Sequence, residues 1–121
     1  MPKTEVVIFA EEDGHSPLIE WMDKIPSKAQ DKCIVRIERL SEMGHELRRP
    51  EADYLRDKIY ELRVALQGVQ YRILYFFYRK TGVLAHGLIK TGDEVPSADI
   101  NLTIERKEKY EDNPQGHTYG G

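Results

Sequence analysis

Three strand-like segments follow one another between residues 58 and 90, and they constrain the fold more than any other part of the chain. The first alternates apolar and polar side chains, as expected for a strand with one buried face. The expected elements in order are a strand over 58–66, a hairpin turn at Gln67-Gly68, a central strand over 69–78, a second tight turn at Thr81-Gly82 and a strand over 83–90. This pattern predicts an antiparallel meander.

A strand and a short helix are expected at the start of the chain. The β-branched and aromatic run over 5–10 predicts the first strand. Ser16-Pro17 fits an N-cap followed by proline at the first helical position, which predicts a helix that runs to Lys24 and ends at Ile25-Pro26.

Two more helices complete the pattern. Ser27 and Gln30 fit an S-x-x-Q capping box, and Gly44 fits a C-terminal stop, so a second helix is expected between them. The apolar stripe of this helix comprises Cys33, Ile34, Ile37 and Leu40. Residues 45–57 are interpreted as a polar, basic connection, and 97–110 as the last helix.

The order β-α-α-β-β-β-α predicts an α+β fold, with an antiparallel sheet and helices packed on one face. The other face would be partly open and available for a ligand. One domain is expected over residues 1–112. Residues 113–121 have no core pattern, so we expect them to form a flexible tail.

The composition indicates a cytoplasmic protein. Cys33 is the only cysteine, so no intramolecular disulfide can form, which suits a reducing compartment. The N-terminal segment does not have the pattern of a signal peptide. The most apolar run, over 73–78, is far shorter than the roughly 20 residues that span a bilayer, so no membrane role is expected.

Charge is unevenly distributed along the chain. The net charge is −3, yet residues 47–90 hold nine Lys or Arg against four acids, and are therefore positive overall. Such a segment between acidic flanks can form a phosphate-facing surface. An unevenly charged but merely solvated surface would give the same composition.

Chemistry is most strongly indicated by polar groups inside the predicted strands. A hairpin turning at 67–68 makes Arg63 and Arg72 direct neighbours on one face, while His86 and Lys90 share a face of the last strand. Two adjacent arginines favour an anion above them. The alternative is that each pairs with a carboxylate such as Glu61. No metal-binding, nucleophile or phosphate-loop motif is present, so neither metal nor cofactor is expected.

These residues also carry a resemblance to a known family. E-L-R at 61–63, Y-R at 71–72 and H-G-x-x-K at 86–90 stand in the order found in the HigB-like, phage-derived Gp49-like branch of the RelE/ParE toxin superfamily. By motif the resemblance covers about residues 54–110. It implies a RelE-like, microbial-RNase-like fold. It also implies a type II toxin that cleaves mRNA on the ribosome without a metal, through attack by a ribose 2′-OH.

The resemblance implies roles for individual positions. It implies that Arg72 neutralises the scissile phosphate and that Arg63 contacts the RNA backbone, with His86 and Lys90 as candidates for moving protons. Further RNA contacts are expected from basic residues before and at the start of the first meander strand: Arg48, Arg49, Arg56 and Lys58. The partners implied are the ribosome, mRNA and a small helix-turn-helix antitoxin, through which alone operator DNA would be bound.

Two alternatives to RNA cleavage stay open. Thr91 stands where the family pattern has a second lysine, and the chain is acidic overall. Both features favour a ParE-like toxin that acts on a protein target such as gyrase. The other alternative is a degenerate relative that binds its antitoxin only as a co-repressor.

Overall fold

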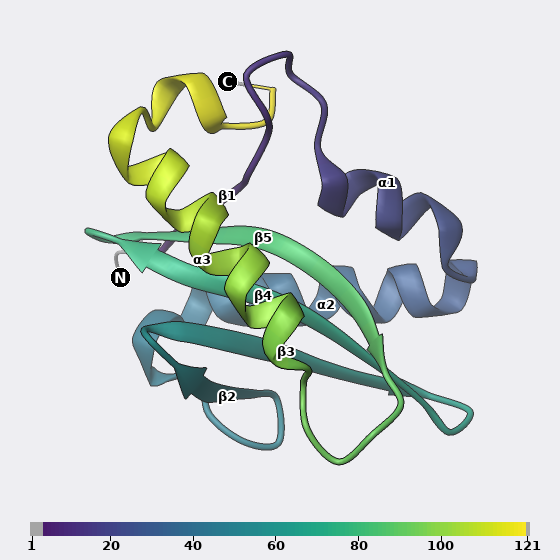
Figure 1. Cartoon of the computed structure of the whole chain (residues 1–121). Helices are drawn as coiled ribbons and strands as arrows, with labels where there is room; N and C mark the ends of the chain where they lie inside the picture. The colour runs from purple at the N-terminus through teal and green to yellow at the C-terminus, as the bar shows by residue number, and fades with distance from the viewer. Residues whose placement is uncertain (1–3, 121) are drawn as a thin grey trace.

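The computed structural model describes residues 4–120 and contains one five-stranded sheet (Figure 1). The strands are β1 (Glu5–Ile8), β2 (Ala52–Arg56), β3 (Ile59–Leu66), β4 (Val69–Tyr78) and β5 (Thr81–Lys90), and their spatial order is β1-β5-β4-β3-β2. Strands β2 to β5 pair antiparallel, whereas β1 joins β5 in parallel. The helices are α1 (Pro17–Lys24), α2 (Ser27–Met43) and α3 (Ser97–Asp112), with short 3-10 turns at Gly44–Glu46 and Gln115–His117.

The predicted meander is confirmed, with one turn displaced. Gln67 and Gly68 both adopt positive φ angles, 51° and 82°, as a two-residue hairpin turn requires. The second turn lies at 79–80 instead of Thr81-Gly82, because β4 continues to Tyr78 and pairs there with Thr81. Arg79 adopts the positive φ that was expected of a glycine.

The expected connection over 45–57 contains a strand that the sequence pattern did not reveal. β2 has only five residues and lies at the edge of the sheet, where Asp53 pairs with Glu61 of β3. Edge strands are often short and polar, so they carry little of the apolar alternation on which a strand prediction depends. The sheet therefore has five strands, and the expected order lacked one.

The helices cover both faces of the sheet. One core joins α1 and α2 to the sheet through residues such as Leu18, Cys33 and Leu62. A second core on the opposite face packs Ile100 of α3 against Leu74 and its neighbours. The expectation of helices on one face thus holds for α1 and α2 but not for α3, which crosses the other face over β4 and β5 (Figure 1). The β2–β3 part of that face stays open.

The helix ends follow the sequence with one exception. The Ser16 side chain accepts a hydrogen bond from the Ile19 N–H, as predicted for an N-cap. The capping box at Ser27 is wrong: Pro26 takes the N-cap position without a side-chain cap bond, and the Gln30 amide donates to the Met22 carbonyl at 2.7 Å. The stripe of α2 also excludes Ile34, because this residue is 49% exposed.

The C-terminal segment packs against the chain that follows β1. The His117 ring stacks on Phe9, its Nδ1 donates to the Ala10 carbonyl at 2.9 Å, and Thr118 forms a bridge with Phe9. The expectation of a flexible tail therefore does not describe residues 113–120. A single buried histidine supplies the anchor, and composition alone does not reveal it. None of the helices within residues 4–120 is long and apolar enough to cross a membrane.

We predict that Gly87→Ala destabilises the domain by about 1–3 kcal/mol, as overpacking of a core does. A Cβ at this position of β5 would collide with the ring of Trp21 from α1. Urea unfolding followed by tryptophan fluorescence measures the change. Gly92→Ala is the matched control, because nothing lies within 4 Å of a Cβ at Gly92. Equal unfolding midpoints for the two variants would contradict the packing described for α1.

Candidate functional site

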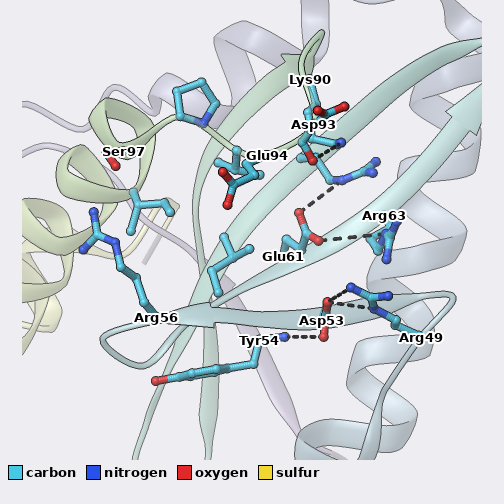
Figure 2. A pocket seen from close by; sticks show the side chains of 15 residues that line it. Arg49, Asp53, Tyr54, Arg56, Glu61, Arg63, Lys90, Asp93, Glu94 and Ser97 are labelled. Carbon is cyan, nitrogen blue, oxygen red and sulfur yellow. Dashed lines mark hydrogen bonds and ion pairs between the residues drawn. The ribbon is translucent and has the colours of Figure 1, made fainter.

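A cleft of about 490 Å³ opens on the face of the sheet that α3 leaves uncovered (Figure 2). Its floor comes from β2, β3 and β4, and its far wall from the connection between β5 and α3. Five cations line it: Arg49, Arg56, Arg63, Arg72 and Lys90. Four carboxylates line it too: Asp53, Glu61, Asp93 and Glu94. The cleft is therefore rich in charge of both signs and nearly balanced.

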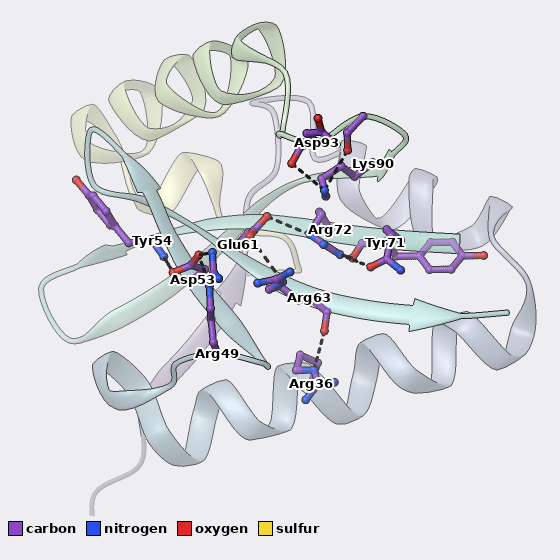
Figure 3. A network of polar contacts seen from close by, with 12 residues as sticks. Arg36, Arg49, Asp53, Tyr54, Glu61, Arg63, Tyr71, Arg72, Lys90 and Asp93 are labelled. Atoms are coloured by element: carbon purple, nitrogen blue, oxygen red, sulfur yellow. Dashed lines mark hydrogen bonds and ion pairs between the residues drawn. The ribbon is translucent and has the colours of Figure 1, made fainter. Parts of the chain in front are cut away.

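The centre of the cleft is a carboxylate shared by two arginines (Figure 3). Arg63 and Arg72 are register partners across β3 and β4, as the sequence predicted, and Glu61 lies on the same face. Glu61 Oε1 is 3.1 Å from Arg72 Nε, and its Oε2 is 3.9 Å from Arg63 Nε. The alternative in which the arginines pair with Glu61 is thus confirmed. The three groups together leave a single positive charge for an anion.

Arg72 lies beneath the cleft surface, with only 2% of the residue exposed. Its Nη1 donates to the Tyr71 carbonyl at 3.1 Å. Its Nε–H does not point along a hydrogen bond to Glu61, so this contact is an ion pair. Burial lowers the pKa of Arg72, and the charge of Glu61 opposes that shift. Glu61 is itself only 6% exposed, so each charge depends on the other.

Three of the other cations are held at the margins of the cleft. Lys90 donates to the carbonyls of Gly92 and Asp93 at 3.1 and 3.2 Å, which fixes the start of the β5–α3 connection. Arg56 pairs with Asp57 and donates to Asn101 of α3. Arg49 pairs with Asp53 at 2.7 Å (Figure 2).

Arg63 is the most available cation near the centre, because its side chain is 29% exposed and its contact with Glu61 is long. The Arg63 carbonyl accepts a hydrogen bond from Arg36 Nε of α2 at 3.0 Å, which fixes the backbone beneath it (Figure 3). Its guanidinium is therefore placed to bind an anion that enters the cleft.

Three of the predicted site residues do not line the cleft. Arg48 borders a separate hollow beside Tyr54 and Tyr60. Lys58 occupies the β2–β3 turn, where its backbone N–H donates to the Tyr54 hydroxyl. The His86 side chain contacts α3 and does not line the cleft.

His86 is part of a partly buried chain of polar contacts that ties α3 to β5. Its Nδ1 faces Arg106 Nη1 at 3.1 Å, and its Nε2 faces Asp99 Oδ1 at 2.6 Å. A guanidinium only donates, so Nδ1 accepts and Nε2 carries the proton that it donates to Asp99. Arg106 also donates to the Ala85 carbonyl at 2.7 Å. Burial lowers the pKa of His86, and the bond to Asp99 opposes that shift.

Sequence reasoning missed part of the site. Glu61 was considered only as a counter-ion, although its spacing of two from Arg63 placed it on the same strand face. Asp99 and Arg106 stand two helical turns apart on α3, so they share the helix face that meets His86. Asp93 and Glu94 of the β5–α3 connection also line the cleft, but they belong to no sequence pattern that predicts a site.

The described residues give little support to a bound metal ion or to a reactive thiolate. Within 4–120, no three His, Cys, Asp or Glu side chains are grouped so as to bind a metal ion. Cys33 is buried, and its burial raises the pKa of the thiol to about 11, so it does not supply a thiolate.

A family model described as "Phage derived protein Gp49-like (DUF891)" matches residues 20–108. The chain belongs to this Gp49-like family. The match includes every residue that lines the cleft. The family is one of RelE- and HigB-like toxins that generally act in toxin–antitoxin systems, which implies an antitoxin partner. A comparison with curated proteins finds no match.

We predict that Arg72→Met destabilises the Gp49-like domain by about 3 kcal/mol, because it leaves the buried Glu61 carboxylate without its closest cation. Adding Glu61→Gln should recover part of that loss. Urea unfolding of the two single variants and the double variant measures the coupling. Arg49→Met removes a cation from an exposed ion pair and is the control, with a change below about 1 kcal/mol. Strictly additive effects at 61 and 72 would argue against the pairing.

We predict that His86 makes stability depend on pH near neutrality. The fold holds the ring neutral, whereas the unfolded chain takes up a proton near its ordinary pKa of about 6.5. Its contribution is therefore complete above about pH 6.5 and is lost as the pH falls towards the lower folded pKa. His86→Gln should flatten this part of the stability profile, which urea unfolding at a series of pH values measures. A slope that His86→Gln leaves unchanged would contradict the assignment.

Proposed function

We propose that this Gp49-like toxin cleaves mRNA on the ribosome, by metal-free attack of a ribose 2′-OH on the adjacent phosphate. The observation that carries the proposal is the Glu61 carboxylate set between Arg63 and Arg72 on an open sheet face. A carboxylate beside phosphate-binding cations supplies the base and the charge stabilisation that this reaction needs. The proposed activity belongs in the cytoplasm.

Each group has a distinct role in this mechanism. Glu61 takes the proton from the 2′-OH as the oxygen attacks phosphorus, and Arg63 binds the non-bridging oxygens of the phosphate. Lys90 faces the leaving 5′-oxygen, to which it can give a proton. No metal or cofactor takes part in this scheme.

Arg72 and His86 take different roles from those implied by the family resemblance. Arg72 is too deeply buried to meet a phosphate first, so it acts from beneath, by holding the Glu61 carboxylate in place. His86 forms hydrogen bonds with Asp99 and Arg106, and these bonds stabilise the position of α3 on the sheet. It is a positioning residue in this scheme.

The near balance of charge in the cleft bears on how RNA reaches it. Arg49 and Arg56 can follow neighbouring phosphates, and the half-exposed ring of Tyr54 can stack on a base. Arg48 and Lys58 lie beyond the cleft and would make more distant contacts. Five cations against four carboxylates give a weak net field for free RNA, which favours a substrate delivered by the ribosome.

Regulation would follow the family pattern. The antitoxin is proposed to be a small helix-turn-helix protein that blocks the cleft and carries the toxin to operator DNA. Co-expression with the neighbouring gene should then yield a complex that purifies as one species.

The test compares three variants on programmed ribosomes. Glu61→Gln and Arg63→Gln should each slow cleavage by about 10²–10³-fold, the usual loss when a charge-stabilising group is removed. Arg79→Gln is the control, since Arg79 lies over Tyr78 in the β4–β5 turn, away from the cleft. Wild-type products should carry 2′,3′-cyclic phosphate ends, and they should fail to form when the attacking 2′-OH is replaced by hydrogen.

Two outcomes would reject RNA cleavage. One is a wild-type rate in both Glu61→Gln and Arg63→Gln with the fold intact. The other is a wild-type toxin that leaves ribosome-bound mRNA whole while blocking DNA gyrase, which would favour the ParE-like alternative. Growth without arrest, together with operator binding by the complex, would favour the co-repressor.

A further inference from the structure

The outer edge of β3 is only partly covered. Pairing with β2 ends at Leu62, so residues 63–66 have no neighbouring strand on that side. In an antiparallel ladder alternate residues direct their backbone groups away from the partner strand, and here these are Arg63 and Ala65. The Arg63 N–H donates to the Glu51 carbonyl at 2.9 Å. Within residues 4–120, no side chain or loop carbonyl accepts the Ala65 N–H.

Side chains of α2 occupy the carbonyls along this edge. Arg36 Nε donates to the Arg63 carbonyl at 3.0 Å, and Lys32 Nζ donates to the Ala65 carbonyl at 3.1 Å (Figure 3 shows Arg36). Charged side chains of this kind keep an edge from pairing indiscriminately. An incoming backbone N–H can take their place at these two carbonyls.

The two sides of this edge differ in chemistry. A hollow of about 300 Å³ on the α2 side contains Val64 and Val35, and Val35 is 56% exposed although apolar. A second hollow of about 330 Å³ contains the cations Arg49 and Arg63. A strand added here would alternate its side chains between the two hollows.

Charge along the edge favours an acidic occupant. Lys32, Arg36, Arg49 and Arg63 line the two hollows, against Asp31 alone. Arg36 and Arg49 already pair with Glu51 and Asp53, but Lys32 forms no ion pair within residues 4–120. A second copy of this chain would bring like charges together at the same edge, which disfavours a symmetric dimer there.

We propose that residues 63–66 of β3 bind an extended segment of a protein partner, added as a further strand with alternating apolar and acidic side chains. Backbone bonds to Arg63 and Ala65 give affinity, and the two hollows select the side chains. The Lys32 and Arg36 side chains, released from the carbonyls, then pair with the acidic side chains of the segment. Arg49 and Arg63 also line the cleft, so, on the proposed function, an occupant of this edge competes with RNA phosphate.

The experiment follows the backbone amides of the isotope-labelled full chain by NMR. The probe is a short synthetic peptide of alternating glutamate and valine, and its counterpart alternates lysine and valine. We expect the glutamate peptide to shift the Ala65 amide and slow its hydrogen exchange on the order of tenfold. Lys32→Glu should abolish this effect. Lys80→Glu changes the charge equally, in the β4–β5 turn at the other end of the sheet, and should not.

A second pair of variants tests the backbone bond. Ala65→Pro removes the outward N–H without touching the β3–β4 pairs and should prevent binding, whereas Ala65→Ser should not. Equal binding of both peptides would overturn the proposal, as would an Ala65 amide that no peptide affects. Protection of Ala65 that rises with protein concentration alone would assign the edge to a second copy. None of these measurements depends on RNA cleavage.

Discussion

The ion pair between Glu61 and Arg72 is the interaction on which the candidate site depends. Both groups are almost wholly buried, so each offsets the cost of burying the other's charge. The pair lies on adjacent strands in the middle of the sheet, where backbone pairing fixes its geometry. It leaves the Arg63 guanidinium as the accessible charge. The centre of the site is therefore one oriented carboxylate with a cation on either side.

The position of α3 decides which part of the sheet stays accessible. Ile100 and Tyr110 hold the helix over β4 and β5, and the chain of Asp99, His86 and Arg106 fixes it by directional polar contacts. The β5–α3 connection then forms the cleft wall opposite β2. Fold and site are therefore coupled: the contacts that seat the helix also set the width of the cleft.

Much of this arrangement could be predicted from local sequence, because strand alternation and a two-residue turn determine register. The pairing of Arg63 with Arg72 followed from Gln67-Gly68 alone. Local patterns could not show that Arg72 lies beneath the surface or that His86 faces α3. Those properties depend on which helix covers which face, and that is set by contacts between residues far apart in the chain. The sequence pattern also did not predict β2, because this strand is short and polar, as its place at the edge of the sheet allows.

The parallel pairing of β1 with β5 has a consequence for the order of folding. The two hairpins between residues 59 and 90 close short loops and need no other part of the chain. By contrast, Glu5 and Thr81, which pair in the sheet, are 76 positions apart. Closing so long a loop costs more conformational entropy, and it yields contacts only when β5 is already in place. We therefore expect the meander to form as a nucleus and β1 to join it late, with the cleft floor assembled before the sheet is complete.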